Sequence, residues 1–165
     1  MAIFNYDTFL KKIILQIKYR LATEVWREFA KVIRPEWVWK VRIYRSLAPT
    51  ALLLPVPLHP SKERIRGFNQ ADLLGRFFSQ YLPYPTVQSV LKIKKTPAQA
   101  TLASPKKRRR NIQASFAVVN PSEIKGKEYI IIDDVVTTGA TCREIAAILK
   151  KNGAAKVYAL TLGHG

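Results

Sequence analysis

Apolar positions change their spacing along the chain, and each spacing predicts a different element. From residue 8 to residue 34, apolar side chains recur every three or four positions with Lys and Arg between them. This pattern predicts an amphipathic helix, which Pro35 ends. Such a helix either packs against the rest of the domain or touches a membrane or DNA with its basic face. Residues 36–46 fit neither the helical nor the strand spacing.

After residue 50, short apolar runs alternate with stretches of helical period. Two polar segments, residues 57–70 and 94–114, predict loops. An alternation of strand, helix and strand is typical of an α/β fold with a mostly parallel sheet flanked by helices, which binds ligands at the carboxyl ends of its strands. We expect strands at 51–56, 86–93, 115–119, 129–132 and 157–162, and helices at 69–81 and 141–151.

The charge of the chain indicates an anionic partner. It carries 28 Lys and Arg residues against 11 Asp and Glu residues, a formal net charge of +17. Such an excess is typical of proteins that bind nucleic acid, an anionic membrane surface or a phosphorylated small molecule. The charge is unevenly placed, because no acidic residue lies between Asp72 and Glu123. Composition alone does not choose among the three partners.

The cysteine count and the hydropathy of the chain indicate the cellular compartment of the protein. Cys142 is the only cysteine, which excludes an internal disulfide and any multi-cysteine zinc site. No apolar run reaches the roughly 18 residues of a membrane-spanning helix. The first residues do not form a signal peptide, because positive charge follows the short apolar stretch instead of preceding it. These features predict a cytoplasmic protein.

The most specific chemical signal is the segment YIIIDDVVTTGAT at residues 129–141. An apolar strand delivers two carboxylates, which suit ribose hydroxyls, and a small-residue turn then starts a helix whose free N–H groups can cradle a phosphate. A capped strand-to-helix turn is the alternative, but it explains one Asp or Thr and not the whole pattern. We therefore expect a ribose 5-phosphate to bind at Asp133, Asp134, Thr137, Thr138, Gly139, Ala140 and Thr141.

A second signal follows the first strand predicted after residue 50. Three cations lie within five residues, and amide side chains follow at the start of a helix. Arg forks and Lys charges of this kind suit a diphosphate, which we expect to contact Lys62, Arg64, Arg66, Gly67, Asn69 and Gln70. His59, in the same segment, is either a catalytic residue or an ordinary packed or surface histidine.

The DDVVTTGAT segment resembles the phosphoribosyl-diphosphate (PRPP) binding motif of type I phosphoribosyltransferases. The wider pattern resembles the ComF family of competence-associated, phosphoribosyltransferase-like proteins: PxPLHP at residues 55–60, RxRGFNQ at 64–70, TxxQ at 96–99, RxxN at 108–111 with Phe116, and DDVVTTGAT at 133–141. The resemblance implies a type I phosphoribosyltransferase-like core in residues 51–165, preceded by a helical, hood-like segment in residues 1–50. Many ComF-like proteins begin with a four-cysteine zinc module, which this sequence does not contain, so we expect no zinc.

The resemblance also implies roles for the candidate residues. Asp133 and Asp134 would contact the ribose hydroxyls, and the turn at residues 137–141 would hold the 5-phosphate. Mg²⁺ would arrive with PRPP and be held largely by ligand oxygens, with these two Asp residues as the protein carboxylates at hand. A mobile basic loop would close over the diphosphate, or else remain merely solvated; its residues are Lys94, Lys95, Lys106, Lys107, Arg108, Arg109 and Arg110. The sequence identifies no catalytic residue and no acceptor.

Three functions fit these features. The first is the uptake of single-stranded DNA in natural competence, with PRPP as a regulatory ligand or with none. The second is transfer of a phosphoribosyl group from PRPP to an unidentified acceptor, and the third is a non-catalytic adaptor that binds competence proteins through its N-terminal helix. Candidate platforms for DNA bases, or else core residues, are Trp26, Trp37, Trp39, Tyr44 and Phe68. We favour the first function, in a cytoplasmic protein that acts at the inner face of the membrane.

Overall fold

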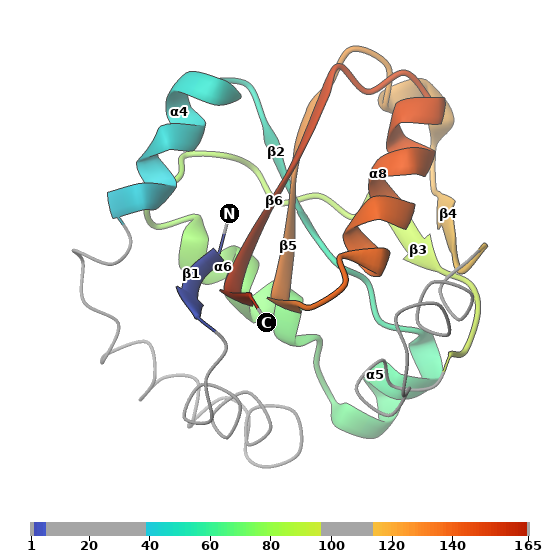
Figure 1. The fold of residues 1–165 in the computed structure, drawn as a ribbon. Helices are drawn as coiled ribbons and strands as arrows, with labels where there is room; N and C mark the ends of the chain where they lie inside the picture. The colour runs from blue at the N-terminus through green and yellow to red at the C-terminus, as the bar shows by residue number, and fades with distance from the viewer. Residues whose placement is uncertain (1, 6–38, 97–113, 165) are drawn as a thin grey trace.

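The computed structural model describes residues 2–5, 39–96 and 114–164. Its strands are β1 (Ala2–Asn5), β2 (Leu52–Pro55), β3 (Val90–Lys92), β4 (Phe116–Val118), β5 (Glu128–Val136) and β6 (Lys156–His164). Its α-helices are α4 (Tyr44–Leu47), α5 (Pro60–Arg66), α6 (Gln70–Phe78) and α8 (Ala140–Lys151), and two 3-10 turns are η1 (Trp39–Ile43) and η3 (Pro121–Glu123). Figure 1 shows β5 and β6 at the centre of the molecule.

Four strands form one parallel sheet in the order β1-β6-β5-β2, and β3 and β4 form a separate antiparallel ribbon (Figure 1). On β5, Ile131 lies opposite Leu54 of β2 on one side and Ala159 of β6 on the other. Strands of a parallel sheet that is covered on both faces are buried throughout, which explains the continuous apolar run in β5. The mostly parallel sheet predicted from the order of elements is confirmed.

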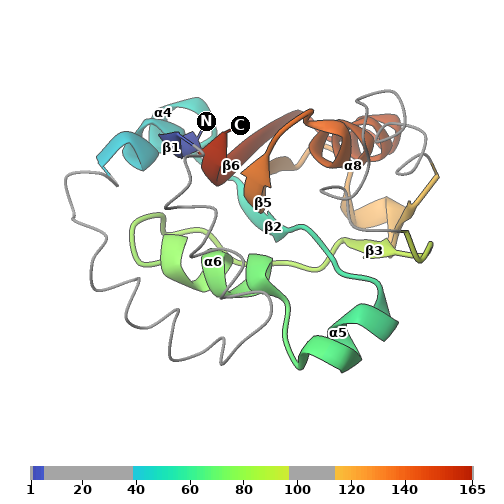
Figure 2. The same ribbon diagram turned by 60° about the horizontal axis from the view of Figure 1, so that its bottom comes forward.

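Successive residues of the central strand serve two different cores. Ile130 and Ile132 belong to a core that Leu74 of α6 and residues of η1 and α4 complete. Ile131 belongs to a second core, with Ile145 of α8 and Phe116 of β4. Figure 2 shows α6 on one side of the sheet and α8 on the other. The alternation follows from the two-residue period of a strand.

The segment at residues 57–70 is not all loop, and that prediction was wrong, because it contains α5. The Nδ1 atom of His59 accepts the N–H of Ser61 at 3.2 Å and caps the helix, and Pro60 occupies its first turn. Gly67 ends α5 in the left-handed conformation, at a φ of +81°, with its N–H on the Glu63 carbonyl at 2.7 Å. A helix this short has too few turns to show a hydrophobic period.

Strand β5 continues further than the apolar run predicts. It ends at Val136, so Asp133 and Asp134 lie inside the strand instead of following it. Pairing with β6 carries the strand on, since Asp133 lies opposite Thr161 and Val136 opposite His164. Strand β1, which the pattern does not predict, also pairs with β6. The predicted strand at 86–93 shortens to Val90–Lys92.

Two predicted segments fall largely outside the described residues: the helix at 8–34 and most of the loop at 94–114. Parts of the first fifty residues do join the sheet and its core, through β1 and through Val41 and Tyr44. The division of the chain at residue 50 stays a prediction. Within the described ranges, no helix is long and apolar enough to cross a membrane.

Candidate ligand-binding site at the carboxyl edge of the sheet

The carboxyl ends of β2, β5 and β6 lie at one edge of the sheet, where α8 begins and α5 follows β2 (Figures 1 and 2). In parallel α/β sheets this edge is where ligands bind, because loops and helix N-termini converge there. The two segments that the sequence singled out, residues 59–70 and 133–141, both lie at this edge, which we call the carboxyl edge. The fold therefore brings the predicted ribose-phosphate and diphosphate residues to one end of the molecule.

Asp133 and Asp134 each bend back onto the following main-chain N–H group. The Oδ1 atom of Asp133 accepts from the N–H of Asp134 at 2.9 Å, and Oδ1 of Asp134 accepts from the N–H of Val135 at 2.8 Å. Asp134 is only 7% exposed, whereas Asp133 is half-buried. Because strand residues alternate, Asp133 shares its face with Ile131 on the α8 side, and Asp134 shares its face with Ile132 on the α6 side. The pair therefore flanks the end of β5 on both faces.

The turn between β5 and α8 passes through a left-handed glycine directly before the helix. Gly139 caps α8 in the left-handed region, at a φ of +67°, and the Thr138 hydroxyl accepts the N–H of Ala140 at 3.4 Å. The guanidinium of Arg143 donates to the Thr138 carbonyl, and a Cβ at Gly139 would lie 3.1 Å from its Nη1 atom. Thr137 is exposed. Arg143 is thus a cation beside the turn that the sequence pattern did not single out.

Helix α5 separates the three cations that the sequence places together. Lys62 and Arg66, four residues apart, share one face of the helix and are partly buried, whereas Arg64 is exposed. The ammonium of Lys62 donates to the Thr96 carbonyl at 2.6 Å. Burial first, then Arg66 and Lys95, lowers the pKa of Lys62 below its ordinary value. The structure therefore brings Lys62 and Arg66 together and directs Arg64 elsewhere.

The remaining residues of the predicted diphosphate set position the loop. Asn69 is 6% exposed, its Nδ2 donates to the Val56 carbonyl at 3.1 Å, and its Oδ1 accepts the N–H of Ala71 at 3.1 Å. Asn69 thus caps α6 and fixes the loop to the end of β2. Gln70 accepts a hydrogen bond from Arg66, and Gly67 ends α5. These contacts give Asn69, Gln70 and Gly67 a supporting role behind the two cations.

Lys92 is a further cation that the sequence pattern did not single out. It lies on β3 with its Nζ atom 5.3 Å from the ring centre of Phe116. Burial first, and then Lys62, lowers the pKa of Lys92 to about 8, while Asp133 acts in the opposite direction. The available signal was its register: Lys92 falls on the same side of β3 as the buried Val90, where an ordinary lysine is not expected.

Two further candidates have structural roles. The ring of His59 caps α5 and also lies 2.9 Å from the Ser61 hydroxyl, which favours a packed histidine over a catalytic one. Cys142 is buried in the second core, where burial, followed by Asp133, raises the pKa of its thiol to about 12. A thiol with so high a pKa is not a nucleophile at neutral pH.

The basic loop is only partly described. Lys94 and Lys95 follow β3 and are exposed, whereas Lys106, Lys107, Arg108, Arg109 and Arg110 lie outside the described residues. Among residues 2–5, 39–96 and 114–164, no three His, Cys, Asp or Glu side chains come together as a metal cluster. A magnesium ion that arrives with a diphosphate needs only one or two carboxylates, and Asp133 and Asp134 fit that requirement.

Comparison with known proteins identifies the fold. A model of the phosphoribosyl transferase domain matches residues 68–163. A crystal structure of adenine phosphoribosyltransferase has a TM-score of 0.51 and 12% identity over 87% of this chain and 71% of that one. The fold is therefore that of a type I phosphoribosyltransferase.

Proteins of similar sequence identify the family to which the chain belongs within this fold. Competence protein F of Haemophilus influenzae is 36% identical over 118 residues, 70% of this chain and 51% of that protein. DNA utilization protein YhgH of Salmonella typhi is 32% identical over 158 residues, 95% of this chain and 68% of that protein. Competence protein ComFC of Bacillus subtilis is 27% identical over 162 residues, 98% of this chain and 62% of that protein. The chain belongs to the ComF family of phosphoribosyltransferase-like proteins and spans about half to two thirds of these relatives.

Proposed function

We propose that the carboxyl edge binds PRPP or a related ribose phosphate. The observation that carries the proposal is the run from Asp133 and Asp134 on β5 to the left-handed Gly139 at the start of α8. In this proposal the N–H groups and hydroxyls of residues 137–141 hold the 5-phosphate, since the start of a helix attracts an anion. The two carboxylates accept hydrogen bonds from the ribose hydroxyls. In the same proposal, Lys62 and Arg66 of α5 contact the diphosphate.

Magnesium belongs to the same proposal. The ion would shield the charge of the diphosphate and orient its oxygens when it binds with the ligand. In this proposal the chain contributes carboxylates at one side of the edge and cations at the other, so that the diphosphate is held in a fixed direction. Transfer of the phosphoribosyl group to an acceptor is an alternative outcome of such binding, and no described residue is assigned to it.

Calorimetric titration with PRPP and Mg²⁺ tests the binding proposal. We expect measurable heat and a rise in melting temperature at millimolar ligand. Asp134→Ala should weaken PRPP binding by about tenfold, because it removes an acceptor for charge-assisted or ribose hydrogen bonds. Glu123→Ala is the matched control, since Glu123 is an exposed acid on η3, at the opposite edge. Absence of both heat and thermal shift in the unaltered protein would show that the cradle does not bind this ligand.

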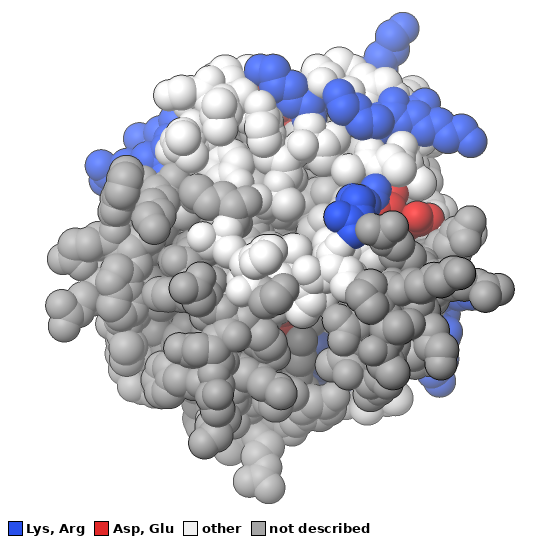
Figure 3. Space-filling model, in the orientation of Figure 1, with Lys and Arg blue, Asp and Glu red and all other residues white. Residues whose placement is uncertain are grey.

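We further propose that the protein acts on single-stranded DNA during uptake in natural competence, as a cytoplasmic protein at the inner face of the membrane. A specific feature supports DNA binding at the opposite, amino edge of the sheet. Backbone hydrogen bonds join residues 125–127 to residues 153–155, at 2.9 Å from Gly126 to Gly153 and 2.8 Å from Ala155 to Lys127. This junction gathers the exposed residues Lys125, Lys127 and Lys151. Figure 3 shows basic side chains along this upper rim.

The structure reduces the number of aromatic side chains that could stack on DNA bases. Tyr44 is 3% exposed, and its hydroxyl donates to the Ala159 carbonyl at 2.7 Å, so it is a core residue and not a platform for a base. Phe68 is half-buried. Trp26 and Trp37 lie outside the described residues, and the side chain of Trp39 is also outside them. Phosphate contacts are therefore the part that can be tested directly.

Fluorescence anisotropy with a labelled oligothymidylate tests this role. Affinity should fall steeply with salt, and Lys125→Gln with Lys127→Gln should reduce the salt slope by about 0.7 for each phosphate that the variant no longer neutralises. Arg42→Gln with Arg76→Gln removes the same charge from exposed positions on η1 and α6. Equal effects in the two double variants, or weak binding that does not change with salt, would contradict the proposal. Binding of competence proteins without DNA binding would favour the adaptor function instead.

A further inference from the structure

One face of the β3–β4 ribbon is apolar and exposed. Leu91 on β3 is 50% exposed, Ile93 directly after β3 is 60% exposed, and Val119 directly after β4 is 55% exposed. Leu91 lies opposite Ala117, and the N–H of Val119 donates to the Ser89 carbonyl at 3.0 Å, so the ladder continues to Val119. Residues two positions apart on a strand share a face. Leu91, Ile93, Ala117 and Val119 therefore form one surface, which we call the ribbon face.

The opposite face of the ribbon is used by the fold itself. Val90 of β3 and Phe116 of β4 are buried in the second core, to which Ile145 of α8 also belongs, and Figure 1 shows the ribbon beside α8. These inner residues hold the ribbon on the domain, so the ribbon face points away from the core. It carries three of the six large hydrophobic side chains that are exposed in the described part of the chain. A single exposed apolar residue is ordinary, but a cluster marks a contact surface.

Cations follow the ribbon face at one end. Lys94 and Lys95 come directly after Ile93 and are exposed. The sequence has no acidic residue between Asp72 and Glu123, so the ribbon itself offers these lysines no carboxylate. An aliphatic surface that ends in exposed cations is complementary to a partner that combines apolar side chains with acidic ones. Burial of the aliphatic groups would supply affinity, and the charges would fix the orientation of the partner.

Other kinds of occupant match the ribbon face less well. Single-stranded nucleic acid stacks on aromatic side chains, and the ribbon face has only aliphatic ones. A second copy of the chain would bring together two molecules that each carry a net charge of +17. An anionic membrane suits Lys94 and Lys95, but it would repel Glu123, the exposed acid on η3 that follows Val119. Proteins that lie on a membrane also favour Trp or Tyr at the interface.

We propose that the ribbon face is a docking surface for an acidic, amphipathic segment of a partner protein. The aliphatic side of the segment packs on Leu91, Ile93 and Val119, and its carboxylates pair with Lys94 and Lys95. This surface is separate from the lysines at residues 125–127 that are proposed for DNA and from the cradle at residues 137–141. The inference goes beyond both proposed sites and depends on neither.

Fluorescence anisotropy tests the proposal with a defined probe. The probe is a labelled synthetic amphipathic helix with Leu on one face and Glu on the other, titrated with the full chain. Replacing its Leu residues with Ser should weaken binding by about tenfold or more, because the charges remain but the apolar contact is lost. This comparison separates docking on the ribbon face from attraction of any acidic peptide to a basic protein. Replacing Glu with Lys should also weaken binding.

Matched variants locate the contact. Leu91→Ser with Ile93→Ser should weaken binding of the Leu and Glu probe by about tenfold. Ile43→Ser with Leu47→Ser is the control, because it removes the same side-chain types from exposed positions on η1 and α4, and it should change affinity by less than about twofold. Lys94→Gln with Lys95→Gln should weaken binding about fivefold at low salt and less at high salt. Melting curves show whether each variant folds.

A single labelled position provides a second measurement. Because Cys142 is only 9% exposed, a new cysteine at Ile93→Cys can be labelled selectively with an environment-sensitive dye such as NBD. The probe helix should shift the emission of this label to the blue, as the dye leaves water. The same label at Ile43→Cys, on η1, should not respond. A response at residue 43 without one at residue 93 would contradict the proposal.

Equal affinity of the two Ser double variants for the probe would overturn the proposal, as would a wild-type protein that does not distinguish the Leu probe from its Ser counterpart. Two other results would assign the ribbon face to a different occupant and would overturn the proposal as well. One is a wild-type dimer in analytical ultracentrifugation that Leu91→Ser with Ile93→Ser converts to monomers. The other is binding to phosphatidylglycerol vesicles that this variant loses while it keeps its affinity for the probe.

Discussion

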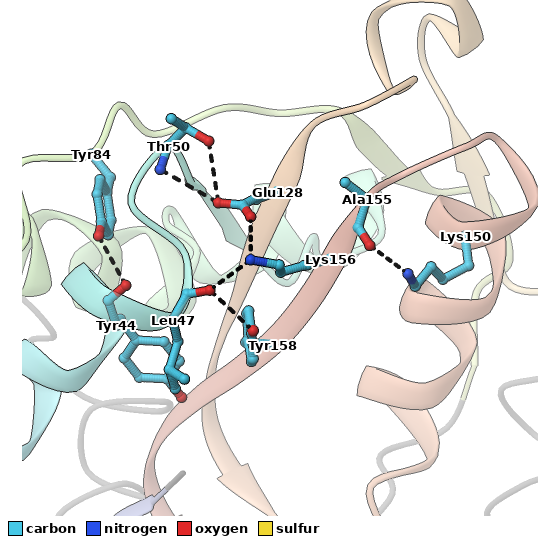
Figure 4. Close-up of polar contacts among 9 residues, drawn as sticks. All are labelled: Tyr44, Leu47, Thr50, Tyr84, Glu128, Lys150, Ala155, Lys156 and Tyr158. Atoms are coloured by element: carbon cyan, nitrogen blue, oxygen red, sulfur yellow. Dashed lines mark hydrogen bonds and ion pairs between the residues drawn. The ribbon is translucent and has the colours of Figure 1, made fainter.

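The two ends of β5 carry acidic residues in opposite circumstances. At the amino edge, Glu128 is 8% exposed and accepts from Lys156 at 2.9 Å and from the N–H and hydroxyl of Thr50 at 3.4 and 3.2 Å (Figure 4). Lys156 also donates to the Leu47 carbonyl at 3.1 Å, and Tyr158 reaches the same oxygen at 3.2 Å. Glu128 and Lys156 therefore hold α4 and the loop after it against β5 and β6.

At the carboxyl edge, cations lie near other cations. Burial first, and then Lys62, lowers the pKa of Lys92, while Asp133 acts in the opposite direction. The difference teaches that charges matched within the chain serve stability, whereas an excess of one sign held in place indicates a missing partner. Variants of the contacts around Glu128 should therefore change stability and not PRPP binding, and variants at the carboxyl edge should change PRPP binding.

A matched pair of glycines should give the largest contrast. Gly139 at the carboxyl edge and Gly126 near the amino edge both have positive φ, at +67° and +74°. Substitution by Ala should cost each about 1–2 kcal/mol of stability, because a side chain is disfavoured in the left-handed region. Only Gly139→Ala also brings a Cβ to 3.1 Å from the Arg143 guanidinium, whereas a Cβ at Gly126 meets nothing within 4 Å.

We therefore expect Gly139→Ala to weaken ribose 5-phosphate binding at least about tenfold, and Gly126→Ala to leave it unchanged. Gly139→Val should abolish binding, since a branched side chain also fills the cradle. Calorimetry for binding and thermal melting for stability check both parts. Similar losses of affinity in the two Ala variants would show that the effect is one of general stability and would break the comparison.

Glu128→Gln should have the next largest effect, on stability and not on ligand binding. It removes the charge that pairs with Lys156 and that Thr50 hydrogen-bonds, so the melting temperature at pH 7 should fall by a few degrees. Affinity for ribose 5-phosphate should match that of the unaltered protein. A clear loss of ligand affinity in this variant would contradict the view that Glu128 serves stability and that the carboxyl edge serves ligand binding.

The same residue predicts a dependence on pH. The hydrogen bond from Lys156, followed by those from Thr50, holds the pKa of Glu128 below its ordinary value. Its contribution to stability is therefore present above the unfolded pKa, about 4.3, and is lost as pH falls through the lower folded value. Melting temperatures of wild type and Glu128→Gln should differ at pH 7 and converge at acid pH. A constant difference down to acid pH would contradict the assignment.

Cys142 should give the smallest effect. Its thiol pKa of about 12 leaves roughly one thiol in ten thousand ionised at pH 8. Reaction with a disulfide reagent such as DTNB should be slow in the native protein and immediate after unfolding in guanidinium chloride. Fast native labelling would show that the start of α8 opens easily, and the phosphate cradle would then be less well formed than the hydrogen bonds of its turn imply.

The sequence predicted the α/β fold and the β5–turn–α8 element because their signals are local. An apolar run, a small-residue turn with Gly139 and a helical period all lie within residues 129–151. The comparisons confirm the family that this element and the PxPLHP and RGFNQ segments resemble. The roles of Asp133 and Thr138 in ligand binding stay predictions. Both residues lie at the carboxyl edge, where a role in ligand binding requires them to be.

Local pattern was insufficient where a partner in space sets the outcome. Helix α5 depends on caps at His59 and Gly67 and is too short to show a period. The end of β5 depends on pairing with β6, which carries the strand past Asp134 to Val136. In the same way, the sequence made Tyr44 a candidate for stacking on a base, but the structure buries it in the core.

By itself, the sequence determined the strand that delivers Asp133 and Asp134, the glycine turn after it and the strong positive charge of the chain. Only the tertiary structure decided which of the cations are exposed and which contact other elements. Lys62, Arg64 and Arg66 are neighbours in sequence, but α5 leaves Arg64 exposed, whereas the Lys62 ammonium donates to the Thr96 carbonyl after β3. The reason is physical: periodicity reports the face of one element, whereas an ion cluster depends on how separate elements pack.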